Sequence, residues 1–155
     1  VPQGSVLLEA TGFNKPDDKF FDPVNEEYKV DEDLLIVETN RTFDEASGTD
    51  IYNEKGKTVF GNWLQLQAGE VQDVVIKYKL PFKLLAEGQN KFFYSLLVQK
   101  QHGSLGSEFS SYLKLNDQLA PLAKFPDDLP SDENGVSFKT KLITDQFYGV
   151  TLINK

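Results

Sequence analysis

The fold is decided by residues 58–115, which read TVFGNWLQLQAGEVQDVVIKYKLPFKLLAEGQNKFFYSLLVQKQHGSLGSEFSSYLKL. Apolar and polar side chains alternate in three parts of this stretch, and a period of two is typical of a β-strand with one buried face. Together with the strand that begins near Thr58, these parts predict four strands joined by short turns, a β-meander whose apolar face a second sheet must cover. The alternating positions are Val74, Ile76, Tyr78 and Leu80, then Phe92, Tyr94, Leu96 and Val98, then more weakly Phe109, Ser111, Leu113 and Leu115.

Further strands are expected before this stretch. Residues 6–11 alternate and predict a first strand, and residues 34–43 combine an apolar run with an alternating segment, which we interpret as a second strand. The pair Lys55-Gly56 predicts the turn of a hairpin that leads into Val59 and Phe60.

The segments after residue 115 differ in character. Residues 116–135 contain three prolines and predict a crossover connection between sheets, with one helical turn near residues 119–123. Residues 135–144 and 147–155 alternate again and predict a C-terminal hairpin. The chain is therefore expected to be a single all-β domain over 1–155, an immunoglobulin-like or jelly-roll-like antiparallel β-sandwich of about eight to ten strands with little helix.

Composition limits the classes of function. The net charge is −8, and the whole excess lies in residues 1–57, where fourteen acidic side chains accompany six basic ones. An acidic surface repels phosphate backbones, so no nucleic-acid partner is expected. The chain has no cysteine and no methionine, not even a starting one, which suggests a fragment of a longer protein. No apolar run approaches the length of a membrane span, so any membrane anchor is expected outside this fragment.

Catalytic chemistry has little support. His102 is the only histidine, and we interpret it as a hairpin-turn residue, since Ser104 is too close in sequence to complete a triad easily. A hydrolase that uses acidic residues is the enzyme hypothesis, but sequence does not place two carboxylates across a cleft. We expect the chain not to be an enzyme.

Two acidic loops have the oxygen-rich chemistry that calcium prefers. Neither loop has the spacing of an EF-hand, so a solvated acidic loop and a calcium site both remain open. The candidate ligands are Asp17, Asp18 and Asp22 in the first loop and Asp128 and Asp132 in the second.

Two further features are candidate binding residues. Trp63, accompanied by Tyr52, Tyr112 and Tyr148, could form an exposed aromatic platform for carbohydrate, although a lone tryptophan in a sandwich is more often buried. The polar side chains of Gln99, Lys100 and Gln101 end an apolar strand, where they form either a contact surface for a partner or a hydrogen-bonded cap on the loops.

Three segments contain a series of motifs: VPQGSVLLEATGF at 1–13, KTVFGNWLQLQAGEVQDVVIKYKLPF at 57–82 and FYSLLVQKQHG at 93–103. They resemble the C-terminal portion of a family of large bacterial surface proteins, classed as the domain of unknown function numbered four thousand and twelve. The chain differs from the family pattern at Ala68 and His102, where the family has proline. The resemblance implies a domain exported on a membrane-anchored protein, with no established activity and no catalytic residues to transfer. The matching residues are Val1, Pro2, Gly4, Ser5, Gly12, Phe13, 58–61, Gly69, Glu70, Leu80, Pro81, 94–97, 99–101 and Gly103.

The sequence and the resemblance together predict a non-enzymatic extracellular module of a bacterial surface protein, which acts as a spacer or in protein interaction and adhesion. Its partner would be a protein or another cell-surface component. The alternative is a carbohydrate-binding module that uses Trp63. A sheet edge left unprotected could also pair with another chain and make the domain an assembly module.

Overall fold

The regular secondary structure of the described residues is mostly antiparallel β-sheet. The computed structural model describes residues 1–15, 27–29, 31–83 and 90–155, and over these residues it contains ten β-strands and one α-helix. All the strand pairs are antiparallel, which confirms the all-β, sandwich-like fold class. The strands belong to two compact units, Val1–Phe82 and Lys83–Lys155. That these units make one domain over 1–155 stays a prediction.

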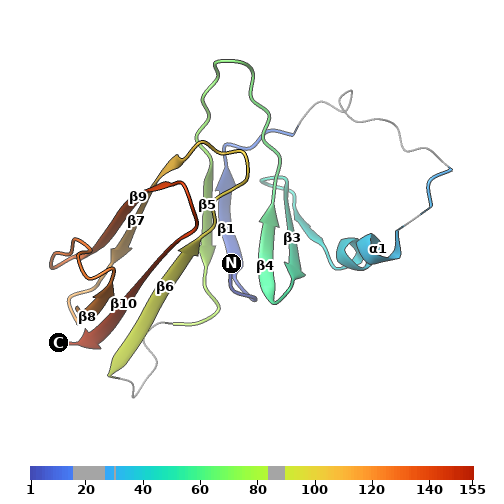
Figure 1. Ribbon diagram of the computed structural model, residues 1–155. Helices are drawn as coiled ribbons and strands as arrows, with labels where there is room; N and C mark the ends of the chain where they lie inside the picture. Colours follow the sequence, from blue (N-terminus) through green and yellow to red (C-terminus); the bar gives the residue numbers. More distant parts are fainter. Residues whose placement is uncertain (16–26, 30, 84–89) are drawn as a thin grey trace. The chain divides into compact units, whose positions relative to one another are not determined.

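The first unit contains two small sheets (Figure 1). One sheet pairs β1 (Val6–Thr11) with β5 (Val75–Lys79), and the other has the order β2 (Thr42–Asp44), β3 (Thr49–Glu54) and β4 (Lys57–Gly61). The β3–β4 hairpin turns at Lys55 and Gly56, which both have positive φ, at 47° and 70°. A turn with two such residues matches the twist of the flanking strands, so the predicted hairpin is confirmed.

Hydrogen bonds and ring contacts join the two sheets of this unit. The Thr58 N–H donates to the Val1 carbonyl oxygen at 3.1 Å, and the Gly4 N–H donates to the Thr58 hydroxyl at 2.9 Å. The Phe60 and Tyr78 rings, from β4 and β5, have centroids 5.9 Å apart. Residues that precede β1 therefore attach this end of the chain to β4.

The second unit is a small two-layer sandwich. It contains β6 (Lys91–Val98), β7 (Ser107–Lys114), β8 (Leu119–Phe125), β9 (Gly135–Leu142) and β10 (Gln146–Asn154), arranged as a β6–β10–β8 sheet and a β7–β9 sheet. The two sheets enclose one apolar core, whose buried members are Phe92, Leu115, Leu119, Leu129, Val136, Phe138, Tyr148, Val150 and Leu152.

Contacts between rings connect the two layers. The Tyr148 ring of β10 lies 4.9 Å from the Phe138 ring of β9, measured between centroids. The Tyr148 hydroxyl also forms a hydrogen bond of 2.7 Å with the Ser111 hydroxyl of β7. This bond satisfies the one polar group of a fully buried side chain, as burial requires.

The predicted β-meander is wrong. Strands were correctly expected in all four of its segments, but β4 pairs with β3, β5 with β1, β6 with β10, and β7 with β9. Alternation shows which side chains share a face and leaves the neighbouring strand undetermined. The predicted C-terminal hairpin is wrong for the same reason, since β9 and β10 lie in different sheets.

The buried face predicted for β5 is wrong as well. Val74, Ile76 and Tyr78 are all exposed, because β5 belongs to a sheet of only two strands, which offers little surface to cover them. The inward face predicted for β6 agrees with the structure, since Phe92 is buried and Tyr94 and Leu96 pack against the core.

Residues 34–37 are helical rather than extended. They lie within α1 (Glu32–Thr39), where the Asp31 carboxylate accepts hydrogen bonds from the N–H groups of Asp33 at 2.9 Å and Leu34 at 3.3 Å. Such an N-terminal cap offsets the unpaired N–H groups of the first turn. The described part of the chain has no helix with the length and apolar character needed to cross a membrane.

Residues 119–125 form a strand, and the helical turn predicted there is wrong. Pro121 lies in β8, which pairs with β10 on one side and is an edge of its sheet. A proline is tolerated on an edge strand because its missing N–H can face away from the ladder.

Candidate functional site

A small cavity of about 250 Å³ in the first unit, here called the Trp63 pocket, is the candidate site. Its apolar lining comes from Phe13, Phe43 and Trp63, and its polar lining includes Lys15, Asp50 and Asn62. A mostly apolar hollow with a few polar groups is the usual form of a small-ligand site.

Asn62 positions the tryptophan. This residue directly follows β4, and its side-chain amide donates to the Ser47 carbonyl oxygen at 2.9 Å and to the Thr49 hydroxyl at 2.8 Å. Its side-chain oxygen accepts the Trp63 N–H at 2.7 Å. Asn62 therefore ties the end of β4 to the β2–β3 turn and fixes the backbone on which Trp63 stands.

The β2–β3 turn is itself held by side-chain hydrogen bonds. The Asp44 carboxylate accepts hydrogen bonds from both the N–H and the hydroxyl of Ser47. The Ser47 and Thr49 hydroxyls lie 2.7 Å apart, and Thr49 is almost fully buried. This wall of the pocket is consequently built by local contacts that the short sequence 44–49 supplies.

Asn14 holds the segment on its other side. Its N–H donates to the Trp63 carbonyl oxygen at 3.1 Å, and its side chain exchanges two hydrogen bonds with the Gln65 backbone, at 2.7 and 3.0 Å. Residues 62–65 are thus fixed by partners from two distant parts of the chain. The pocket is well defined before any ligand arrives, which reduces the entropy lost on binding.

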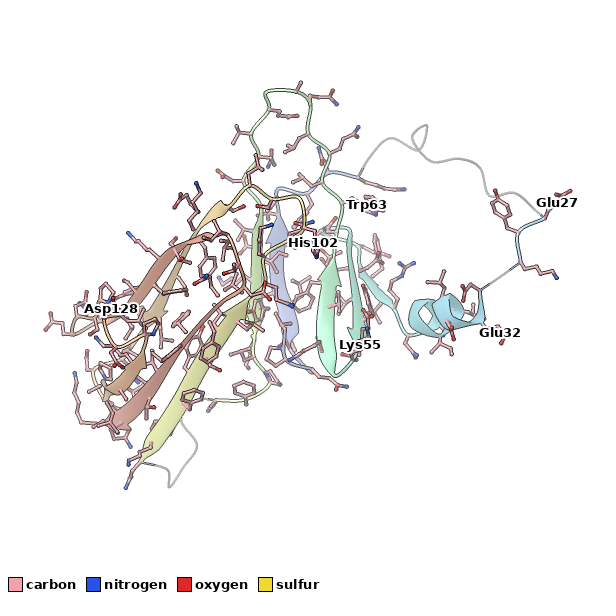
Figure 2. All side chains as sticks on the ribbon, in the orientation of Figure 1. Glu27, Glu32, Lys55, Trp63, His102 and Asp128 are labelled. Atoms are coloured by element: carbon pink, nitrogen blue, oxygen red, sulfur yellow. The ribbon has the colours of Figure 1, made fainter. Side chains whose placement is uncertain are left out.

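The chemistry of the pocket combines flat apolar rings with charge. The side chains of Trp63 and Phe43 are 53% and 61% exposed; Figure 2 marks the position of Trp63. Beside them an Arg41 guanidinium nitrogen lies 3.3 Å from an Asp50 carboxylate oxygen. Because this ion pair is partly open to solvent, it retains hydrogen-bonding capacity for a ligand.

None of the tyrosines predicted to accompany Trp63 is among the residues that line its pocket. Tyr148 is fully buried in the core of the second unit, so its predicted place on an exposed platform is wrong. Tyr112 is 52% exposed on β7, also in the second unit, and Tyr52 is half-buried on β3. The other lining residues are not predicted from the sequence as site residues. Among them, Phe13 belongs to a segment that resembles the surface-protein family, and Phe43 and Asp50 lie in no motif.

Gln99, Lys100 and Gln101 lie at one end of the second unit. The Lys100 N–H donates to the Asp145 carboxylate at 2.8 Å, and the Gln101 carbonyl oxygen accepts the Lys100 ammonium at 3.1 Å and the Ser104 N–H at 3.3 Å. The Lys100 main chain thus joins the β6–β7 and β9–β10 connections. The role of the three side chains, as a loop cap or as a contact surface, stays a prediction. The side chains of Gln99 and Gln101 are exposed.

The acidic loops are described only in part. Asp17, Asp18 and Asp22 lie outside the described residues. Asp128 is exposed, and the Asp132 carboxylate accepts the N–H groups of Asn134 and Gly135 at 2.8 and 2.9 Å, which stabilises a tight turn. Within the described ranges no three acidic or histidine side chains are grouped as metal ligands would be, and calcium binding stays a prediction.

His102 is exposed in the turn between β6 and β7 (Figure 2). These two strands belong to different sheets, so the turn connects sheets and the predicted hairpin there is wrong. The hydroxyl of Ser104 lies 3.2 Å from the hydroxyl of Ser107, the first residue of β7.

Comparison with known proteins gives no assignment. No family model matches the chain, and no curated protein and no solved structure is significantly similar to it. The resemblance to the bacterial surface-protein family of unknown function therefore stays a prediction.

Proposed function

We propose that the chain is a non-enzymatic extracellular module of a bacterial surface protein with an adhesive role, and that it binds a saccharide ligand in the Trp63 pocket. The observation that carries this proposal is the exposed indole of Trp63, fixed on a hydrogen-bonded backbone beside the Arg41–Asp50 ion pair.

The chemistry of sugars fits this combination of groups. One face of a pyranose ring presents C–H groups that pack on an indole, and the ring hydroxyls donate to carboxylates and accept from guanidinium groups. The Trp63 and Phe43 rings supply the apolar contact, and the Asp50 carboxylate, which also pairs with Arg41, supplies a polar one. A cavity of about 250 Å³ accommodates one sugar ring of a longer polymer rather than a large cofactor.

Protein interaction is the second candidate, and a different surface supports it. On the outer face of the β6–β10–β8 sheet, the exposed side chains of Phe93, Leu97, Phe125 and Phe147 surround Gly149. The Phe125 and Phe147 rings are 5.9 Å apart between centroids. An exposed apolar group of this kind is typical of surfaces that contact other macromolecules.

Replacing Trp63 with alanine tests the saccharide proposal. We expect the wild-type chain to be retarded in native gels that contain one or more soluble polysaccharides from a panel of β-glucans, xylans, mannans and chitin oligomers. Loss of the indole should raise the dissociation constant obtained from the retardation by about tenfold or more. The reason is that burying half an indole contributes about 1.4 kcal/mol or more to binding.

Tyr112→Ala is the matched control, since Tyr112 is an aromatic side chain of nearly the same exposure on the other unit. The control should retain the retardation of the wild type. Equal retardation of the wild type and the Trp63→Ala variant would contradict the proposed site. A wild-type chain that no polysaccharide retards would count against saccharide binding and favour protein interaction.

A further inference from the structure

One edge of β9 is only partly paired. The strand pairs with β7 along its whole length on one side. On the other side, residues 130–132 run antiparallel to its first residues, where the Ser137 N–H donates to the Pro130 carbonyl oxygen at 2.9 Å and the Asp132 N–H donates to the Gly135 carbonyl oxygen at 3.0 Å. Beyond Ser137, no strand of the described chain continues this pairing.

The direction of each β9 amide follows from these bonds. Backbone groups of alternate residues point to the same side of a strand, so the outward N–H of Ser137 implies that the N–H groups of Lys139 and Lys141 also point away from β7. The Leu115 N–H donates to the Asn134 carbonyl oxygen at 2.8 Å, so the backbone groups of residue 134 face the β7 side. By the same alternation, those of residues 137, 139 and 141 face away from β7.

Among the described residues, four main-chain groups of this edge therefore have no hydrogen-bond partner. They are the Ser137 carbonyl, the N–H and carbonyl of Lys139, and the Lys141 N–H; the Lys141 carbonyl oxygen accepts the Ile143 N–H at 2.9 Å. Such a row of unpaired donors and acceptors is a template for one more strand.

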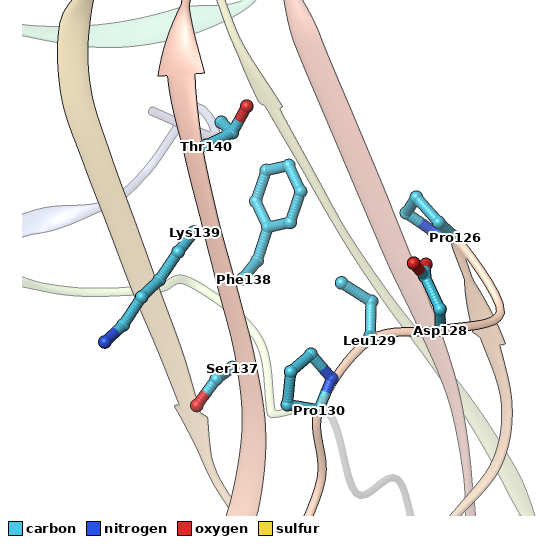
Figure 3. Close-up of a pocket in the computed structure, with 8 residues that line it drawn as sticks. All are labelled: Pro126, Asp128, Leu129, Pro130, Ser137, Phe138, Lys139 and Thr140. Carbon is cyan, nitrogen blue, oxygen red and sulfur yellow. The ribbon is translucent and has the colours of Figure 1, made fainter.

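A cavity of about 450 Å³ lies beside the same edge. Figure 3 shows Phe138 and Thr140 directed into it and Lys139 directed away, as alternation on a strand requires. Its apolar floor includes Leu129 and Phe138, which are 4% and 7% exposed. The facing loop is held by the Lys124 ammonium, which donates to the Leu129 carbonyl oxygen and, at 3.1 Å, to the Ser131 hydroxyl.

Charge separates the two faces of the edge. Lys139 and Lys141 are exposed and lie on the outer face, away from the core. Asp128 lines the cavity, and its carboxylate disfavours an acidic side chain on that inner side. A strand added here would thus place acidic side chains beside the lysines and apolar ones in the cavity.

We propose that the free edge of β9 binds an extended peptide as an added antiparallel strand, in which acidic side chains alternate with small apolar ones. The residue opposite Lys139 exchanges two main-chain hydrogen bonds with it and carries the acid. Its two neighbours place their apolar side chains over Leu129 and Phe138. Strand addition of this kind takes affinity from main-chain bonds and specificity from alternate side-chain pockets. This inference does not depend on the Trp63 pocket, which belongs to the other unit.

The direct test is a titration of the ¹⁵N-labelled 155-residue chain with a capped peptide of seven residues that alternates valine and glutamate. We expect saturable shifts of the Lys139 and Lys141 amide resonances, with slower hydrogen exchange at both, and smaller changes at Phe138 and Thr140, whose amides already bond to β7. Unchanged Lys139 and Lys141 resonances at about 1 mM peptide would overturn the proposal, as would shifts confined to another surface.

Substitutions at Lys139 separate the main-chain and charge contributions. Lys139→Pro removes the outward N–H without breaking the ladder with β7, and it should weaken peptide binding by about tenfold or more. Lys139→Glu should weaken binding of the glutamate peptide by about three- to tenfold and strengthen binding of a lysine-containing counterpart.

Lys114→Gln is the matched control, because it removes the same charge from β7, and it should leave affinity within about twofold of wild type. Equal affinity of the wild type and both Lys139 variants would contradict strand addition. These measurements report only on the second unit, so their failure is distinguishable from failure of saccharide binding at Trp63.

Discussion

Replacing Tyr148 with alanine is expected to lower the free energy of unfolding of the second unit by about 3–5 kcal/mol, the range for deleting a buried aromatic ring. The Tyr148 side chain is 0% exposed. Its ring lies 4.9 Å from that of Phe138 and 5.8 Å from that of Tyr94, so its loss leaves a cavity between the two sheets. Urea unfolding of the whole chain, followed by far-ultraviolet circular dichroism, measures the effect.

Tyr148→Phe is the control for the ring itself. This change removes only the hydroxyl that bonds to Ser111, so it should cost about 1 kcal/mol. If the alanine variant were as stable as the phenylalanine variant, Tyr148 would not be the centre of the core, and the packing of β10 against β9 described above would be wrong.

Replacing Gly12 with alanine is expected to destabilise the first unit by about 3 kcal/mol or more. Gly12 has a φ of 82°, and a Cβ atom built on it would lie 1.9 Å from the Asp73 carbonyl oxygen. No real Cβ contact is that short, so β1 and the segment before β5 would have to separate at this end. Thermal unfolding followed by circular dichroism, together with Trp63 emission as a probe of the first unit, measures the loss.

Gly48→Ala distinguishes steric overlap from backbone conformation. Gly48 has a similar φ of 70°, but no atom lies within 4 Å of a Cβ placed there. Its alanine variant therefore carries only the left-handed backbone cost of about 1–2 kcal/mol. Equal destabilisation by the two substitutions would show that the close approach of Asp73 to Gly12 is absent in solution.

Alternation in the sequence correctly predicts where most strands lie, but it does not predict which strands pair with each other. The pattern in 91–98 correctly predicted β6, with Phe92 in the core, because the side-chain period reports directly on burial. Partner choice depends on contacts between residues far apart in the chain. The short connection after β9, residues 143–145, carries the chain between sheets, although its length also suits a hairpin.

At two elements the sequence prediction is wrong because of one local signal. A helix cap outweighs an apolar run in the first, and a proline does not exclude a strand in the second. Asp31, followed by Glu32 and Asp33, is a good start for a helix, whereas the apolar run 34–37 alone predicts a strand. Pro121 favoured a connection over a strand, yet an edge strand accepts it.

The candidate site was predictable only through its tryptophan. Residue type alone points to Trp63, whereas the backbone around it is held by hydrogen bonds with Asn14 and Asn62. Hydrogen bonds between residues 14 and 65 have no signature in a single sequence. The free edge of β9 could not be predicted either, because the sequence does not show that β10 pairs in another sheet and leaves β9 with one partner strand.

Quenching of the single tryptophan tests the central claim most directly. Trp63 emission should be red-shifted and readily quenched by iodide, and a saccharide that retards the chain in gels should protect it from quenching and shift the emission to shorter wavelength. Blue-shifted emission that iodide does not quench would contradict the exposed pocket. Quenching that the retarding saccharide leaves unchanged would contradict Trp63 as the place where the ligand binds.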